Sequence, residues 1–237
     1  MLRLIIGVCV LFICIGCISC SKNTDADAGA TPKNWARISA IRQKHVVISG
    51  TDSIITLKEI AQASFFADPA NLTVLTDAGS LSINGTNLSQ DGSHHYYYEG
   101  NDLQYDSKIE WAGGGNSSWA VFSYKDSIVF PDYFGPMPDV VDKANGFTMQ
   151  LDSSTVANAD SVRISVDDAN HAPVMKTFYA RAGQVTIPAA DLAILNTVTD
   201  QTAVIAIMPY HGINRVYRNK GYFFTKERRL YRSVNIN

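Results

Sequence analysis

The chain has 237 residues and a formal net charge of −2, with 20 lysine and arginine residues against 22 aspartate and glutamate residues. At 46% apolar and 18% charged residues it has enough apolar side chains to bury a core, which argues against wholesale disorder. The near-neutral charge argues against a nucleic-acid-binding protein whose affinity comes from many phosphate contacts.

The chain opens on the pattern of a signal peptide. Arg3 precedes an almost unbroken apolar stretch from Leu4 to Ile18. A helix of that length spans roughly 22 Å, less than the roughly 30 Å hydrocarbon core of a bilayer. The pattern therefore favours a cleaved signal over a permanent membrane span.

All four cysteines lie in this first segment, at Cys9, Cys14, Cys17 and Cys20. The spacing from Cys14 to Cys20 is that of an iron–sulfur ligand run, but no later cysteine supplies the fourth thiolate that a cluster needs. We therefore assign the cysteines to N-terminal processing and not to a metal site.

The segment from Ile15 to Lys22, IGCISCSK, resembles the lipobox of bacterial lipoproteins, in which a small residue precedes a cysteine that is acylated and becomes the mature N-terminus. Its second half, Ser19-Cys20-Ser21-Lys22, is similar to lipoprotein starts of Bacteroidota. The resemblance implies lipidation at Cys20, with Cys17 as the alternative, and an anchor in the outer membrane, on its periplasmic or its surface face. With Cys20 acylated, no thiol is left for a disulfide, a zinc site or a nucleophile.

Composition divides the remainder into a tether and a folded part. The tether is small, polar and without periodicity. Pro131, Pro136 and Pro138 interrupt the later pattern and mark a domain boundary. The expected regions are a signal peptide at 1–19, the acylated cysteine and flexible tether at 20–34, and two domains at 35–135 and 136–237.

The first domain carries the period-two pattern of β-strands. Ala61, Ala63 and Phe65 alternate with other residues, as one face of a strand does. Asn84-Gly85 is a strong tight-turn signal, and Gly113 to Gly115 predict a hairpin loop. Short strands are expected at 46–48, 54–57, 61–66, 80–83, 96–98, 103–105, 109–111, 119–124 and 127–130, whereas 35–44 fits either a strand or three turns of helix.

The second domain continues this pattern. Strands are expected at 147–151, 161–166, 176–180, 184–187, 202–208, 217–224 and 230–236. Seven short strands at this spacing are typical of a sandwich with immunoglobulin-like architecture. Pro188 to Leu195 fits a short helical crossover. The sequence thus predicts an all-β fold of two β-sandwich, immunoglobulin-like domains after the signal peptide and tether.

Aromatic residues of the first domain give the best indication of a binding site. Flat rings on an exposed sheet face can stack on sugar rings, while nearby Asn and Asp side chains bond the hydroxyl groups. The alternative is that strand propensity places these rings in the core. The candidate ligand-binding residues are Tyr96, Tyr98, Trp111 and Trp119.

The last 23 residues hold a second candidate surface, because seven bases face a single acid, Glu227. Such a patch would attract acidic polysaccharide or lipid headgroups. The alternative is a terminal hairpin whose aromatic residues face the core and whose bases face water. The bases are Arg215, Arg218, Lys220, Lys226, Arg228, Arg229 and Arg232.

No signature of a metal or catalytic site is present. His94 and His95 would point to opposite faces of a strand, which makes them a poor chelating pair, and the cluster from Asp167 to His171 is typical of a turn. The motifs G-x-S-x-G, H-E-x-x-H and the phosphate-binding loop do not occur. We expect no cofactor, metal or catalytic residue, although five histidines leave open a serine–histidine–aspartate triad assembled in space.

These observations favour a non-enzymatic binding or adhesion lipoprotein of the cell envelope, with carbohydrate as the expected ligand. The alternatives are a structural subunit of a fimbrial or envelope complex that assembles through sheet edges, and a hydrolase with an unrecognised site. The expected partners are a membrane, through the N-terminal lipid, and a glycan or protein, but no nucleic acid. Asp52-Ser53-Ile54, Asp126-Ser127-Ile128 and Asp160-Ser161-Val162 also resemble sites at which Bacteroidota O-glycosylate exported proteins, or they are turns into strands.

Overall fold

The computed structural model describes residues 34–49, 52–68, 71–105 and 108–237. Strands account for 63% of the structure and helix for 2%, so the chain is all-β, as the sequence predicts. The predicted signal peptide and the lipidation candidates Cys17 and Cys20 lie outside the described residues. Within the described ranges, no helix is both long enough and apolar enough to cross a membrane.

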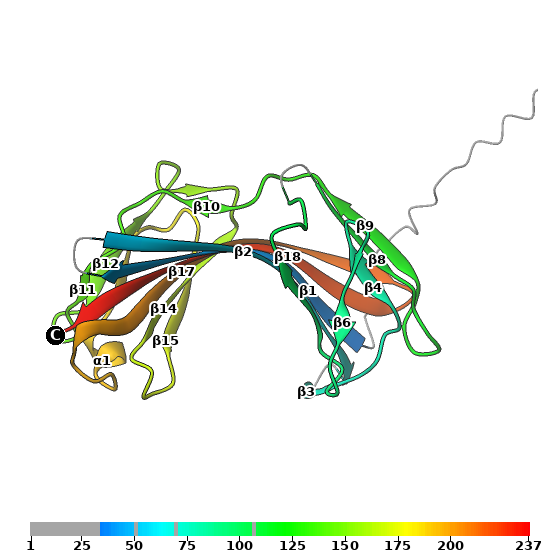
Figure 1. Ribbon diagram of the computed structural model, residues 1–237, viewed down its shortest axis with the longest axis horizontal. Helices are drawn as coiled ribbons and strands as arrows, with labels where there is room; N and C mark the ends of the chain where they lie inside the picture. The colour runs from blue at the N-terminus through cyan, green and yellow to red at the C-terminus, as the bar shows by residue number, and fades with distance from the viewer. Residues whose placement is uncertain (1–33, 50–51, 69–70, 106–107) are drawn as a thin grey trace, which may run out of the picture.

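One ten-stranded sheet runs through the described part of the molecule. Two long antiparallel hairpins form its centre, and the first strand of one pairs in parallel with the second strand of the other, from Asn34 opposite Lys220 to Val46 opposite Arg232. Figure 1 shows these strands bent into an arch with a lobe at each end. The four strands are β1 (Asn34–Ser49), β2 (Asp52–Asp68), β17 (Val198–Tyr217) and β18 (Lys220–Ile236).

In the first lobe, a four-stranded sheet packs against one half of the arch. Its strands, in spatial order, are β5 (Thr86–Asn87), β4 (Leu81–Ile83), β8 (Ile109–Gly113) and β9 (Phe122–Asp126). The main sheet is extended beside β2 by β7 (Tyr96–Gly100), β6 (Ser89–Gln90) and β3 (Asn71–Leu75). The core between the sheets is rich in aromatic rings, among them Phe65, Trp111 and Tyr222.

In the second lobe, the other half of the arch is extended by β14 (Ser161–Asp167) and β15 (Val174–Tyr179). Facing it are two short pairs, β12 (Phe147–Leu151) with β16 (Gly183–Ile187) and β10 (Asp132–Tyr133) with β13 (Val156–Ala157). The helix α1 (Ala189–Leu192) and the strand β11 (Val140–Val141), parallel to β18, complete the lobe. This core is mostly aliphatic, with Leu151, Ile164 and Ile207 fully buried.

The two cores are separate because the inner face of the arch, the face that the lobes cover, changes from apolar to charged and back along each long strand. On β18, Tyr222 and Phe224 belong to the first core, and Leu230 opens the second. Between them on the same face lie Lys226 and Arg228, since alternate strand residues share a face. A charged belt therefore divides one sheet into two hydrophobic units.

The predicted pair of sandwiches at 35–135 and 136–237 is corrected in one respect: the two ranges do not have separate main sheets. The long strands β1 and β2 extend from the first lobe toward the second, and β17 and β18 contribute to both cores. The proline-containing stretch is the place where the chain crosses between the lobes, as Figure 1 shows. Strand length explains the difference, because 16 to 20 residues are enough to serve two cores.

Most predicted strands are present, and 35–44 is strand, not helix. The Asn84-Gly85 turn and the β8–β9 hairpin are confirmed, as is the short helix after Pro188. The predicted strands at 103–105 and 127–130 are wrong, since neither range has ladder partners. The ranges 217–224 and 230–236 are largely one continuous strand.

Candidate functional site

Three of the four predicted ligand-binding rings lie in the core of the first lobe. Tyr96, Trp111 and Trp119 are 2%, 1% and 3% exposed. Tyr98 is partly exposed, but its hydroxyl donates to Oδ1 of Asp102 at 3.0 Å. The expectation of an exposed platform built from these rings is therefore corrected: they pack between the two sheets, as the alternative interpretation had it.

Tyr96 illustrates how such a ring serves the fold. Its hydroxyl donates to Asp77 at 2.8 Å and accepts the backbone N–H of Ala78 at 2.9 Å. Burial is the main reason that the pKa of Tyr96 is raised to about 12. The group therefore stays protonated at neutral pH and holds the turn that precedes β4.

The bases of the C-terminal segment divide between the two faces of β18. On the inner face, Lys226 is buried and lies 3.1 Å from Oδ1 of Asp126, while Arg228 lies 3.7 Å from Oδ1 of Asp132. Arg232 pairs with Asp139. These three acids lie along the stretch that runs from the last residue of β9 through β10 to the residue before β11, so the inner-face bases fasten this crossover region to the sheet. They are not a patch open to an acidic ligand.

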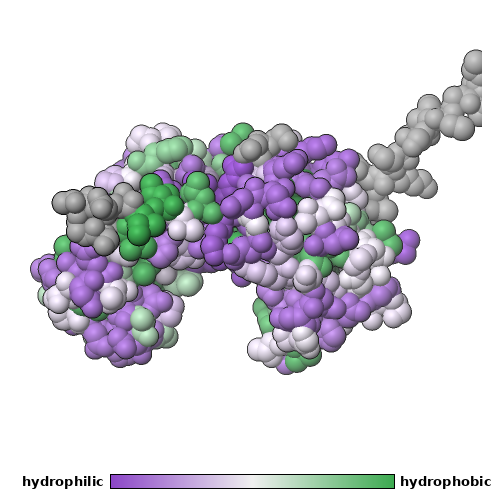
Figure 2. Space-filling view, in the orientation of Figure 1, coloured by the Kyte–Doolittle hydropathy of each residue, from purple (hydrophilic) through white to green (hydrophobic). Residues whose placement is uncertain are grey.

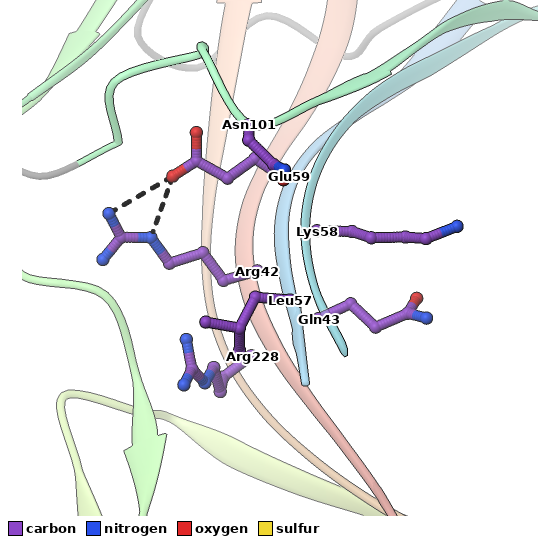
Figure 3. Close-up of a pocket in the computed structure, with 7 residues that line it drawn as sticks. All are labelled: Arg42, Gln43, Leu57, Lys58, Glu59, Asn101 and Arg228. Atoms are coloured by element: carbon purple, nitrogen blue, oxygen red, sulfur yellow. Dashed lines mark hydrogen bonds and ion pairs between the residues drawn. The ribbon is translucent and has the colours of Figure 1, made fainter. Parts of the chain in front are cut away.

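A central notch lies where the charged belt is open to solvent, and Figure 3 shows its residues. It encloses about 370 Å³. Arg42 donates through Nε and Nη2 to Oε1 of Glu59, at 3.3 and 3.4 Å, while Lys58 and Gln43 point to the other side of the strands (Figure 3). Because Arg42 and Arg228 already have carboxylate partners, the notch offers a ligand little unmatched charge.

A second hollow lies on the outer face, the face of the arch opposite the two cores. It encloses about 700 Å³, and we call it the outer hollow; its lining is Trp35, Ala36, Arg37, Phe66, Leu72, Asn214 and Phe223. Trp35 is directly opposite Phe66 on β2 and Gly221 on β18. The three aromatic rings of the outer hollow thus come from three neighbouring strands, and all three are partly exposed.

Two glycines let the rings of the outer hollow lie along the sheet. A Cβ atom on Gly221 would lie 2.5 Å from Cε3 of Trp35, and one on Gly212 would lie 2.6 Å from Cε2 of Phe223. Each ring therefore occupies the space that a side chain would need. Both rings lie against the backbone of their glycine and remain partly exposed to a solute.

No cluster of metal-ligating side chains occurs in the described ranges, where no group of three or more His, Cys, Asp or Glu residues could hold an ion. Two histidines pair with carboxylates: His171 Nδ1 is 2.9 Å from Oδ2 of Asp168, and His211 Nδ1 is 2.9 Å from Oδ2 of Asp160. In the described structure, Nε2 of His211 is buried without a hydrogen-bond partner. Neither pair forms a hydrogen bond to a serine among the described residues, so neither has the geometry of a nucleophilic triad.

The cluster at Asp167 to His171 is a turn, as its composition predicts. The buried Asp168 accepts the backbone N–H groups of Asn170 and His171 and, from beyond α1, that of Asn196 at 2.7 Å. The amide of Asn196 is the leading cause that holds the pKa of Asp168 well below its usual range. Asp168 therefore fastens two loops of the second lobe together.

The rings of the outer hollow were not among the predicted binding residues, although the sequence holds a signal for two of them. Neighbouring strand residues point to opposite faces. In the pairs Phe65-Phe66 and Tyr222-Phe223, one ring must therefore leave the core, and Phe66 and Phe223 do so. Trp35 stands alone in the sequence, and its position depends on pairing with distant strands.

No protein-family model matches the sequence, and no curated protein matches it either.

Proposed function

We propose that this chain is a non-enzymatic binding lipoprotein of the bacterial envelope, anchored in the outer membrane through an acylated Cys20, and that it holds carbohydrate in the outer hollow. The lipobox-like segment supports the anchor. A tether of small polar residues then separates the membrane from the first strand of the sheet.

The observation that carries this proposal is the arrangement of Trp35, Phe66 and Phe223 in the outer hollow. Three partly exposed rings on adjacent strands form an apolar surface beside the amide of Asn214 and the guanidinium of Arg37. Pockets that bind small ligands combine an apolar lining with a few polar groups that fix orientation. A sugar ring presents apolar C–H faces and a rim of hydroxyl groups, which matches this combination.

A glycan array probed with the full chain in detergent tests the proposal. We expect wild type to bind a defined set of glycans and Trp35→Ala to reduce the affinity for them about tenfold, which corresponds to about 1.4 kcal/mol of stacking. Phe223→Ala gives a second variant in case the first is poorly folded. Far-UV circular dichroism checks that both variants keep the β-sheet spectrum.

The matched control is Tyr179→Ala, which removes an aromatic ring that is 81% exposed in the other lobe. It should leave glycan binding unchanged. Absence of binding to any glycan by wild type, or equal binding by wild type and both hollow variants, would contradict the proposed function.

One observation favours the alternative of a structural subunit. The first part of β2, from Asp52 to Lys58, pairs with β1 on one side and, within the described residues, has no strand on its other side. Ile54 and Ile55 are 59% and 54% exposed there, and Figure 2 shows a hydrophobic patch where Figure 1 places this hairpin. An open apolar strand edge is a template for pairing with another chain, and the occupant we consider is a second copy of this chain.

A further inference from the structure

Next to the outer hollow, an arginine cluster contains more positive charge than its single carboxylate balances. Arg37, Arg163 and Arg229 surround Glu227, which is 1% exposed. Glu227 is the one carboxylate that pairs with these arginines among the described residues. Two positive charges therefore have no matching negative charge.

The three arginines differ in how they use Glu227. Arg229 binds it with two nitrogens, Nε to Oε1 at 2.9 Å and Nη2 to Oε2 at 3.4 Å. Arg163 is farther, with Nη1 at 3.9 Å from Oε1, and its guanidinium lies 5.5 Å from the ring centre of Tyr210. Arg37 has neither an ion pair nor a hydrogen bond in the described part of the chain. The hydrogen bonds of the Glu227 carboxylate thus go to Arg229, which leaves the guanidinium groups of Arg163 and Arg37 available to a ligand.

A small pocket lies between these available groups. It encloses about 150 Å³ and is lined by Arg37, Arg163, Tyr210, Phe223, Thr225 and Glu227. It shares Arg37 and Phe223 with the outer hollow, so the two cavities adjoin. At its base, the Thr225 hydroxyl donates to Oγ of Ser39 at 2.8 Å, and both residues are buried.

The electrostatic environment of Arg37 supports a binding role, because its side chain is exposed and therefore open to a ligand. Partial desolvation is the first cause that lowers the pKa of Arg37, attraction to Glu227 opposes it, and the charges of Arg163 and Arg229 lower the pKa further. Like charges that outnumber their counter-ions repel one another, and an added anion would reduce that repulsion. Guanidinium groups bind carboxylate and sulfate through paired hydrogen bonds, which makes them suited to this task.

We infer that the pocket between Arg37 and Arg163 binds an anionic group, carboxylate or sulfate, of the same saccharide whose ring lies on Trp35, Phe66 and Phe223. The inference rests on the proposed function and narrows its ligand to acidic glycans. The aromatic rings supply contact with the sugar body, and the arginines select the charged substituent.

The test uses a glycan array that carries uronate-containing, sulfated and neutral glycans, with the full chain in detergent. Wild type should bind acidic members at least tenfold more tightly than their neutral counterparts of the same backbone, and inorganic sulfate should compete while chloride at equal ionic strength does not. Uronate and sulfate members tell which anion is preferred. Arg37→Gln should lose most of that preference and Arg37→Lys should keep part of it, because lysine retains the charge but not the paired donors.

The matched control is Lys125→Gln, which removes an exposed cation that pairs with Glu110 on the opposing small sheet and should leave the preference unchanged. Equal binding of acidic and neutral glycans by wild type, or an unchanged preference in Arg37→Gln, overturns the anion site and leaves the aromatic platform standing. Both the aromatic platform and the anion site are supported if Trp35→Ala loses all glycan binding while Arg37→Gln loses only the preference for acidic glycans. Absence of any binding by wild type overturns the proposed function and this inference with it.

Discussion

At the scale of single residues, buried polar groups in this protein hold loops in place. Asp168 accepts hydrogen bonds from two backbone amides of its own turn and from Asn196 beyond α1. It is 2% exposed, so a lost partner is not replaced by water. Substitution of this residue therefore measures directly how much one buried carboxylate contributes to the free energy of unfolding.

We predict that Asp168→Asn lowers the free energy of unfolding at pH 7 by about 1–3 kcal/mol, because the amide group cannot accept from both sides and leaves a buried N–H without a partner. The folded-state pKa of Asp168 is lowered, so its contribution is present above the unfolded value of about 3.9 and is lost as the pH falls below it. The difference between wild type and variant in urea unfolding should therefore shrink between about pH 5 and pH 2.

The control for this prediction is Asp200→Asn, at an exposed position in the irregular first part of β17, where water replaces the lost bonds to Thr202. Asp200→Asn should change the urea midpoint little, both at pH 7 and at the acidic end of the range. A constant difference between wild type and Asp168→Asn across the whole pH range would show that the charged form is not the source of the stability.

At the scale of elements, the open edge of β2 is suited to pairing with another strand. Residues 53–57 contain no charged side chain, whereas exposed strand edges in monomeric proteins are commonly protected by charge or proline. We predict that the full chain in detergent forms a concentration-dependent dimer by sedimentation velocity. Ile55→Lys should shift it to monomer, since a lysine at the edge opposes strand pairing.

Val129→Lys is the control for the edge prediction, because Val129 is 70% exposed but lies in a loop with no strand edge. It should leave the dimer intact. A monomer at every concentration for wild type, or dimers unaffected by Ile55→Lys, would remove the argument for assembly through β2.

The strands also show which parts of the fold the sequence alone can predict. Alternation and turn residues located β8, β9, β12 and β16, because both strands of each pair are short and the signals are local. The parallel pairing of β1 with β18 joins residues about 186 positions apart, and no local pattern encodes it. The outer hollow could not be predicted for the same reason, since Trp35 lies beside Gly221 and Phe66 only because β1 pairs with β18 and with β2.

At the scale of the whole molecule, the shared strands make the two cores dependent on each other. The hairpin of β17 and β18 contributes side chains to both cores, so unfolding of one lobe exposes strands that the other needs. The crossover acids Asp126, Asp132 and Asp139 add ion pairs to β18 along the belt between the lobes. A molecule built in this way should unfold as one cooperative unit.

Tryptophan fluorescence can test this cooperativity, because all three tryptophans, Trp35, Trp111 and Trp119, lie in the first lobe. Leu151 is 0% exposed in the core of the second lobe, and Leu151→Ala should cost about 2–5 kcal/mol through lost packing and a residual cavity. If the lobes are coupled, this distant substitution lowers the urea midpoint seen by fluorescence as much as the midpoint seen by far-UV circular dichroism. Ile194→Ala, at a side chain 54% exposed in the same lobe, should leave both midpoints in place. A fluorescence midpoint that stays at the wild-type value while circular dichroism shows two transitions would instead establish two independent domains.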